Sequence, residues 1–237
     1  MAIPLTLGVP RSRGPRSLLA DLLCATQEVA ATHIVASATT DSATPGPRVI
    51  SASTLLENPG TDLGRIIVAL DVDPVELRTR EQASYEAVRF HLDCTSSDLG
   101  DALALRLPSP LAVFVAGDDE NVVLAETAQQ LTAAGRIPGL DTGYSVGEVA
   151  DFLAVLAHAD TGYVARARDG AEILALLAGT VAALRGDDVR AAITHPEPAK
   201  LTALIPEAAE AMREVILGIE IADPEEASRE LAAAGLR

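Results

Sequence analysis

Short unbroken runs of apolar residues alternate along this chain with amphipathic stretches, and the clearest run follows Arg65 in the segment at residues 65–70. That run is followed by Asp71, Asp73 and Pro74. A continuous apolar segment bounded by turn residues predicts a strand that is buried on both faces of a parallel sheet. The two acidic residues would then lie at the carboxyl end of the strand, which is where α/β proteins place their sites.

The same pattern predicts a series of further elements. Strands are expected at residues 3–9, 33–38, 87–93, 111–116, 137–140, 162–166 and 191–194. Helices are expected at residues 17–31, 49–56, 96–107, 120–134, 145–157, 172–184, 199–217 and 224–234, with a helix or loop at 75–84. The helix from residue 145 opens with Ser145-Val146-Gly147-Glu148, which is the pattern of a capping box.

Strands and helices alternate about seven times, which predicts a parallel sheet with right-handed crossovers. A (β/α) barrel and an open doubly wound sheet both satisfy this pattern. The number of units and the length of 237 residues favour a TIM-type barrel, shortened or incomplete, with parallel strands and outer helices. We expect a single barrel-like domain over residues 1–237 that ends in C-terminal helices over 199–237, because no Pro/Gly/Ser-rich linker divides the chain.

Composition narrows the range of partners. Hydrophobic residues make up 49% of the chain but aromatic residues only 3%, and tryptophan is absent. Such a chain can fill a large aliphatic core, but it lacks the aromatic surface that stacks on bases. The formal net charge of −16 argues against nucleic acid or an anionic membrane as a partner. A small-molecule substrate is expected instead, with assembly as a homo-oligomer or as a heteromeric subunit left open.

The cysteines and the chain start indicate the compartment. Cys24 and Cys94 do not have metal-binding spacing, and Cys24 falls within an expected helix as a small buried residue. Free thiols indicate a reducing compartment. The chain begins with a strand-like pattern rather than a signal peptide, and no apolar run approaches the roughly 20 residues that span a bilayer. A cytoplasmic protein is therefore expected.

Acidic residues are the first candidates for chemistry. The common fingerprints are absent from the sequence, which has no P-loop, Rossmann glycine motif, nucleophile-elbow serine or paired-histidine zinc motif. Acidic residues follow several expected strands, namely Asp71, Asp73, Asp93, Asp118, Asp119 and Asp141. Carboxyl groups that converge on one rim of a parallel sheet would suit Mg²⁺. The alternative is that they cap the helices that follow, which we favour for Asp118 and Asp119.

His91 and Asp93 alternate on the expected strand at 87–93, so both side chains leave the same face of the sheet. The pair could orient an imidazole for acid–base catalysis, and with Asp71 it forms the candidate catalytic set. The alternative, which the pattern favours, is the solvated face of an edge strand. Arg166 ends a later strand and could clamp a phosphate, unless it is an ordinary surface residue.

Several motifs in the first third of the chain occur in a fixed order. They are a Leu/Ala-rich segment ending in Ala-Thr, a strand ending in Ser-Ala-Thr-Thr, a proline turn, an Ala-Ser-Thr-Leu-Leu helix and a Gly-Arg pair, at residues 18–26, 37–40, 45, 52–56 and 64–65. A later strand at 110–117 ends in Val-Ala-Gly. Together these motifs resemble the bacterial-luciferase-like family over residues 17–70 and 110–130.

This resemblance implies a (β/α) barrel that binds FMN or the deazaflavin F420 and catalyses reduction or monooxygenation. The positions nearest the cofactor would be Ser37, Thr39, Thr40 and Gly117. Arg166, a candidate anion contact from its place at the end of a strand, would be a further cofactor-binding residue. The matching region begins close to the start of the chain, where the family has a further βα unit. A shortened barrel that has lost the cofactor is therefore one form of this hypothesis.

Three functions stay open at this point. The first is a luciferase-like flavin- or F420-linked oxidoreductase or monooxygenase, either active or degenerate. The second is a Mg²⁺-dependent lyase or hydrolase on an α/β barrel that uses Asp71, Asp73 and Asp93. The third is a non-catalytic, barrel-derived partner subunit, which requires an exposed apolar patch, expected at Val215–Leu217 or at a sheet edge.

Overall fold

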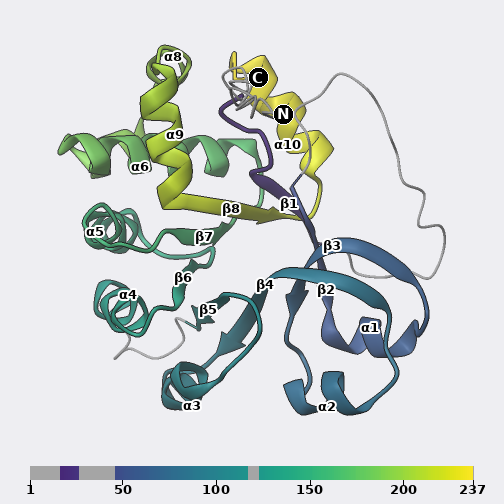
Figure 1. Ribbon diagram of the computed structural model, residues 1–237. Coiled ribbons are helices and arrows are strands. Elements are labelled where there is room, and N and C mark those ends of the chain that lie inside the picture. The colour runs from purple at the N-terminus through teal and green to yellow at the C-terminus, as the bar shows by residue number, and fades with distance from the viewer. Residues whose placement is uncertain (1–16, 27–45, 117–122, 237) are drawn as a thin grey trace, which may run out of the picture.

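In the part of the chain that the structure describes, eight parallel strands form one sheet that curves into a nearly closed barrel (Figure 1). The computed structural model describes residues 17–26, 46–116 and 123–236. The strands are β1 (Leu23–Ala25), β2 (Arg48–Ser51), β3 (Asp62–Ala69), β4 (Ser84–Cys94), β5 (Leu111–Val115), β6 (Ile137–Leu140), β7 (Tyr163–Arg166) and β8 (Ile216–Ile221). Their order is β1-β8-β7-β6-β5-β4-β3-β2, and a parallel bridge between Thr26 and Val49 brings β1 beside β2. The expected TIM-type barrel, shortened or incomplete, is confirmed, and the open-sheet alternative is wrong.

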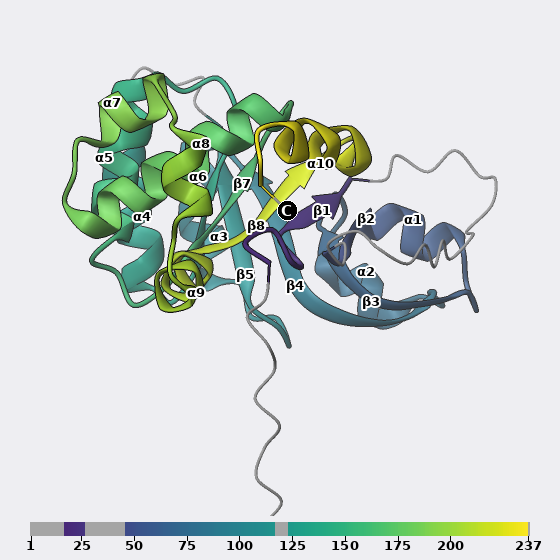
Figure 2. The same cartoon turned by 90° about the horizontal axis from the view of Figure 1, so that it is seen from above.

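Helices surround the strands on the outside. They are α1 (Ala52–Glu57), α2 (Pro74–Thr79), α3 (Leu99–Ala104), α4 (Leu124–Ala133), α5 (Val146–Leu156), α6 (Gly170–Arg185), α7 (Val189–Thr194), α8 (Pro198–Thr202), α9 (Pro206–Val215) and α10 (Pro224–Ala233), with a 3₁₀ turn at Ser96–Asp98. Figure 1 shows α4, α5 and α6 side by side outside β5–β8, and α1 and α2 together beyond β2 and β3. Figure 2, seen from above, shows these two groups on opposite sides of the strands. Within the described ranges, no helix combines the length and the apolar character needed to cross a membrane.

Local sequence signals set the ends of several helices. Ser145 accepts a hydrogen bond from the backbone N–H of Glu148 (3.3 Å), and the Glu148 side chain accepts one from the Ser145 N–H (2.8 Å), so the predicted capping box is confirmed. The last helix begins at Pro224 after the N-cap Asp223, as the sequence predicts. Gly186 ends α6 with a φ of 71°, a left-handed conformation that glycine adopts without strain.

The main core lies between the strands and the helices, because alternate strand residues point to opposite faces of the sheet. Ile66 of β3 packs in an outer cluster that reaches α1, α2 and α3. Tyr163 of β7 packs in a second outer cluster that includes residues of α5, α6 and α10. Ile67, next to Ile66, belongs instead to a small inner cluster with Val49. The barrel interior is therefore filled by a separate set of side chains.

The helix expected at 17–31 is wrong over its described part. Residues 18–22 form turns, and β1 follows them directly. The leucine spacing matches one face of a helix, but parallel pairing with β8 holds the segment as a strand. Cys24 therefore lies in a strand rather than a helix, although it is buried as expected.

Two other short segments differ from their predicted type. The helix expected at 49–56 begins only at Ala52, because the residues before it form β2 in register with β3. The strand expected at 191–194 is part of α7, whose N-cap Asp188 accepts a hydrogen bond from the third residue of the helix (3.0 Å). The expected strands that lie outside the described residues are those at 3–9 and 33–38.

The C-terminal region contains a strand that the sequence pattern did not predict. The helix expected at 199–217 is divided into α8 and α9, and the chain then enters β8 at Ile216. Ile216 is buried and its two neighbours are half-buried, so the apolar patch expected at Val215–Leu217 is wrong. Across the described residues, the large exposed hydrophobic side chains are scattered over separate elements: Val75, Val123, Val146, Leu184 and Ile205.

Candidate functional site

Polar side chains form a hydrogen-bonded chain through the barrel interior. Arg89 and His91 both lie on β4, and Nε of Arg89 donates to Nε2 of His91 (2.7 Å). Nδ1 of His91 is hydrogen-bonded to one carboxyl oxygen of Glu220 on β8. The other carboxyl oxygen of Glu220 accepts a hydrogen bond from Nε of Arg166 on β7 (3.1 Å). Residues from three strands are thereby joined across the barrel.

Arg166 extends this chain to the mouth of the barrel, the end at which the parallel strands finish. Nη1 and Nη2 donate to the two oxygens of Asp93 (2.7 and 3.0 Å), and Nη1 also donates to Asp141, which directly follows β6 (3.1 Å). The side chains of His91 and Glu220 are 1% and 6% exposed, whereas that of Arg166 is 24% and that of Asp93 66% exposed. We call these six residues the charged network: Arg89, His91, Glu220, Arg166, Asp93 and Asp141. The network begins in the barrel interior and ends at the mouth in two accessible carboxyl groups.

Two glycines and one aromatic ring accommodate the charged network. Cζ of Arg166 lies 3.9 Å from the centroid of the Phe114 ring, which is a cation–π contact. That ring lies against Gly139, where an added Cβ would come within 2.5 Å of it. Gly218 leaves similar space for Arg89, because a Cβ there would lie 2.9 Å from Nη2 of Arg89. Barrel interiors are usually filled by layers of branched apolar side chains. This part of the interior instead contains charged side chains, and glycines leave the space that they need.

Hydrogen bonding and burial determine the protonation of His91 and Glu220. Because a guanidinium group can only donate, the bond from Arg89 requires an unprotonated Nε2, and the ring proton therefore lies on Nδ1, facing Glu220. Burial lowers the pKa of His91 and outweighs the opposing effect of Glu220, so the imidazole is neutral at pH 7. Burial alone would raise the pKa of Glu220, but its contacts with His91 and Arg166 hold that pKa below its ordinary value. Glu220 is therefore an ionised acceptor.

The network contains more carboxyl groups than guanidinium groups. Burial lowers the pKa of Arg166, but Asp93 and Glu220 together raise it above its ordinary value, so this guanidinium stays charged. Arg89 is the second cation, and Asp93, Asp141 and Glu220 are the three acidic members. The formal charge of the site is therefore negative.

The structure places four predicted residues, His91, Asp93, Asp141 and Arg166, in this network, but His91 and Asp93 are not hydrogen-bonded to each other. The favoured interpretation of this part of the chain as the solvated face of an edge strand is wrong, because β4 lies between β3 and β5 and His91 is buried. Arg89 and His91 of β4 face the barrel interior, whereas Ser84 and Glu86 near the start of the strand are exposed. Asp93 lies at the mouth and is connected to His91 through Arg166 and Glu220.

The other predicted acidic residues have separate contacts. Asp71 accepts hydrogen bonds from the backbone N–H (2.9 Å) and the hydroxyl group of Ser53 at the start of α1. Asp73 is the N-cap of α2 and accepts from the N–H of Val75 (2.8 Å), which confirms the capping interpretation for this residue. Outside the described residues lie Ser37, Thr39, Thr40, Gly117, Asp118 and Asp119.

Two members of the network, Arg89 and Glu220, were not predicted from the sequence. A signal for Glu220 was present, because Ile219 and Ile221 alternate with Gly218 and Glu220. This is the pattern of a strand with one apolar and one polar face. Arg89 shares the inward-facing alternation of the strand that carries His91, so the same signal identifies it.

The carboxyl groups of the Mg²⁺ hypothesis do not form one cluster. In residues 17–26, 46–116 and 123–236, no group of three or more His, Cys, Asp or Glu side chains could hold a metal ion. Asp71 is bound to Ser53, whereas Asp93 is bound to Arg166. These two acidic residues therefore belong to different local structures.

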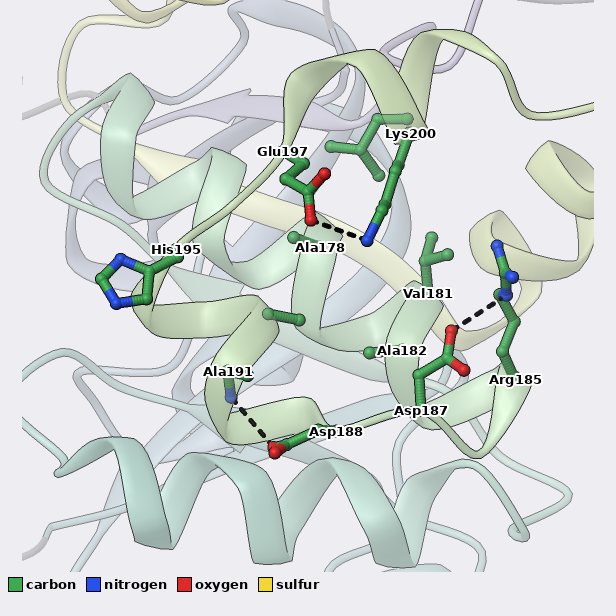
Figure 3. Close-up of a pocket in the computed structure, with 12 residues that line it drawn as sticks. Ala178, Val181, Ala182, Arg185, Asp187, Asp188, Ala191, His195, Glu197 and Lys200 are labelled. Carbon is green, nitrogen blue, oxygen red and sulfur yellow. Dashed lines mark hydrogen bonds and ion pairs between the residues drawn. The ribbon is translucent and has the colours of Figure 1, made fainter.

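A cavity of about 460 Å³ lies in the helix layer outside the barrel, among α6, α7 and α8 (Figure 3). Small apolar residues of α6 form one of its walls. Its two basic residues are each paired with a carboxyl group, because Lys200 contacts Glu197 (2.6 Å) and Arg185 contacts Asp187 (3.1 Å), and Asp188 caps α7 by accepting from the N–H of Ala191 (3.0 Å). Each charged side chain of the lining therefore has a partner within the helix layer, and the network at the barrel mouth is the stronger candidate site.

No protein-family model, curated protein or solved structure matches this chain. The resemblance to the bacterial-luciferase-like family therefore stays a prediction from the residues. Of the motifs that carry it, the strand at 110–117 and the helix at 52–56 correspond to β5 and α1, whereas the segment at 18–26 is not a helix. Inferences about function have to start from the charged network.

Proposed function

We propose that this chain is an acid–base enzyme whose site lies at the carboxyl-end mouth of the barrel, with Asp93 and Asp141 as the groups that act on a small molecule. One observation carries the proposal: Nη1 of Arg166 donates to both carboxyl groups, at 2.7 and 3.1 Å. The two groups therefore face each other across a single nitrogen atom. They lie at the end of the barrel where enzymes of this architecture carry their sites.

Both carboxyl groups keep the capacity to bind a ligand. An ionised carboxyl group offers about four acceptor positions. Asp93 uses one position on each oxygen for Arg166, and Asp141 uses one for Arg166 and one for the N–H of Thr142 (2.7 Å). Acceptor positions beyond these contacts are available to a hydrogen bond or a proton from a ligand, which is what a general base requires.

The charge of the site indicates the class of ligand. Three carboxyl groups face two guanidinium groups in the network, and the whole chain has a formal net charge of −16. An anionic ligand would be repelled by both, whereas a ligand with an amine or with hydroxyl donors would be attracted. The proposed substrate is therefore a neutral or cationic small molecule, and the proposed step is removal of a proton from it.

A ligand screen with matched variants tests this proposal. Thermal unfolding of the wild-type protein is measured with sets of cationic, neutral and anionic metabolites. A ligand at about 100 times its Kd stabilises the folded state by about 2.7 kcal/mol, which raises Tm by roughly 5–10 °C in a chain of this size. The variant Asp141→Asn should lose most of that shift.

The control is Asp151→Asn, because Asp151 pairs with Arg190 (3.0 Å) on the outer helices and both side chains are exposed. It should keep the full shift. A preference for anionic ligands, or equal binding by Asp141→Asn and Asp151→Asn, would contradict the proposed function.

A luciferase-like oxidoreductase or monooxygenase that uses FMN or F420 is the second candidate, favoured by one observation: the chain has the barrel fold that the resemblance implies. Both cofactors are anionic, and Arg166, the cation expected to contact them, is already bound to three carboxyl groups. The absorbance of the isolated protein and fluorescence titrations with FMN and F420 separate the candidates. Binding at micromolar concentration would favour the redox function, and affinity no better than millimolar would count against it.

The Mg²⁺-dependent lyase or hydrolase is tested in the same thermal assay. It predicts that Mg²⁺ raises Tm and that Asp71→Asn removes the effect. Asp71 is bound to Ser53 at the start of α1, so Asp71→Asn should change Tm even without Mg²⁺. The Tm of this variant without Mg²⁺ is therefore the baseline for its Mg²⁺ response. An equal Mg²⁺ response in both proteins would remove Asp71 from this hypothesis.

A further inference from the structure

Glu220 occupies the centre of the charged network, and each of its carboxyl oxygens contacts a different residue. Oε1 contacts Nδ1 of His91, and Oε2 accepts a hydrogen bond from Nε of Arg166 (3.1 Å). We propose that His91 and Glu220 are positioning residues, which hold the Arg166 guanidinium in the orientation that bridges Asp93 and Asp141. This inference rests on the proposed function, because that function is the reason for holding Arg166 in place. Its test uses the protein without a ligand.

The Arg166 guanidinium is held on more than one edge. A guanidinium group is planar, and its five donors point in fixed directions. Asp93 binds Nη1 and Nη2, whereas Glu220 binds Nε. The Phe114 ring covers one face, with its centroid 3.9 Å from Cζ. Once these contacts are made, the direction of the remaining Nη1 donor is set, and Asp141 lies in that direction at 3.1 Å.

His91 determines where the carboxyl group of Glu220 lies. Arg89 donates to Nε2 of His91, so the opposite nitrogen presents a proton to Glu220. The Phe114 ring also restrains the imidazole, through an edge contact with centroids 5.6 Å apart. In the described structure His91 has no hydrogen bond to Arg166, and its hydrogen-bonded connection to Arg166 passes through Glu220. Phe114 contacts both side chains, and for this reason substitution of Glu220, which leaves Phe114 in place, is tested as well.

Stability alone does not account for this arrangement. Burying charged groups costs free energy, and well-packed apolar residues of similar volume often stabilise a fold at least as well. The charged chain also requires two positions without a side chain, since Gly139 and Gly218 clear the space for Phe114 and Arg89. A role in orienting the groups at the barrel mouth would explain why the interior contains these charged side chains.

Arginine side-chain NMR tests the inference without a ligand. In the wild-type protein, Arg166 should give a slowly exchanging Nε–H signal and separate Nη–H signals, because all three nitrogens are hydrogen-bonded. His91→Leu removes a partner of Glu220 and no direct partner of Arg166. In that variant the Nε–H should exchange with water about tenfold faster or more, the factor that corresponds to one hydrogen bond to a charged group.

Tyr163→Phe is the matched control. Tyr163 lies on β7 with Arg166, but its hydroxyl group is hydrogen-bonded to Thr180 of α6 (2.8 Å) in the outer core. This variant also removes a buried hydrogen bond, and it should leave the Arg166 signals unchanged. A change of the same size in this control would show a general loosening of the fold and would overturn the inference.

Glu220→Gln is the second variant, and it decides the matter if His91→Leu does not fold. His91 and Arg166 contact different carboxyl oxygens, and in the amide one of these positions is an NH₂ group that only donates, so one donor loses its acceptor and the same faster exchange is expected. Unchanged Arg166 signals in the folded variants would overturn the inference. Neither result depends on whether Asp93 and Asp141 act on a ligand, so failure of this inference is distinguishable from failure of the proposed function.

Discussion

Removing the carboxyl group of Glu220 should destabilise the fold far more than removing an exposed carboxyl group. The Glu220 side chain is 6% exposed and is bonded to both His91 and Arg166. In Glu220→Ala, the Nδ1–H of His91 stays buried with its acceptor removed. Nε of Arg166 also loses its partner, although the two Nη groups keep Asp93.

The size of the loss follows from these two contacts. A buried donor left without a partner costs about 1–3 kcal/mol, and a hydrogen bond to a charged group contributes about 1.5–3 kcal/mol. Together they agree with the loss of about 3–5 kcal/mol seen when one partner of a buried charged pair is removed. At roughly 2–4 °C per kcal/mol for a chain of this size, Glu220→Ala should lower Tm by roughly 6–20 °C.

Urea unfolding followed by circular dichroism measures the free energy of unfolding of each variant. Glu76→Ala is the control, because the ion pair of Glu76 with Arg80 (2.7 Å) is exposed on α2 and such pairs contribute about 0–1 kcal/mol. Combining Arg89→Met, His91→Leu and Glu220→Leu should recover much of the loss, since fewer buried polar groups are left without partners. A loss below about 1 kcal/mol in Glu220→Ala, equal to that of an exposed pair, would refute the reasoning.

Three further predictions concern pH, packing and capping. Stability should fall as the pH drops below about 6.5, because the pKa values of His91 and Glu220 are lowered by folding and the unfolded chain therefore binds more protons. Urea midpoints between about pH 8 and pH 4 measure this dependence, and a flat profile would contradict it. Gly139→Ala should cost about 1–3 kcal/mol by overpacking against Phe114, and an unchanged urea midpoint would show that the ring can move aside. Ser145→Ala should cost about 1 kcal/mol by removing the N-cap of α5, whereas Ser145→Thr should keep most of the stability; equal losses in both variants would argue against the capping role.

Strands that are apolar on both faces could be predicted from the sequence alone. In β3, Ile66 and Val68 pack against the outer helices, while Ile67 packs in the inner cluster. No position from Ile66 to Val68 therefore faces solvent, and the apolar run is continuous there. That signature depends only on local sequence, which is why the run at 65–70 identified both the strand and the parallel sheet.

The polar face of β4 shows where local patterns stop being informative. A strand whose polar residues face solvent and one whose polar residues face a barrel interior have the same alternation of residue types. The burial of His91 depends on the pairing of β4 with both β3 and β5, which is a long-range property. The sequence could therefore place His91 and Asp93 on one face, but it could not show which environment that face meets.

Glu220 was missed for a related reason. The short strand β8 directly follows α9, and its first apolar residues also fit the last turn of a helix. Glu220 then stood in a segment without an assigned element. Its partners His91 and Arg166 are far from it in the chain, so no local spacing could connect the three residues.

The charged network depends on closure of the barrel, which explains why its site and its stability are linked. Pairing of β7 with β8 places Arg166 beside Glu220, and closure then brings β4 near enough for His91 to reach the same carboxyl group. Apolar side chains such as Val164 and Ile67 line other parts of the interior, and a low-dielectric surrounding strengthens the hydrogen bonds of the charged groups. A change that separates β8 from β7 would therefore remove the central acceptor of the network and the orientation of Arg166 together, whereas a change confined to the mouth should alter the site and leave the fold intact.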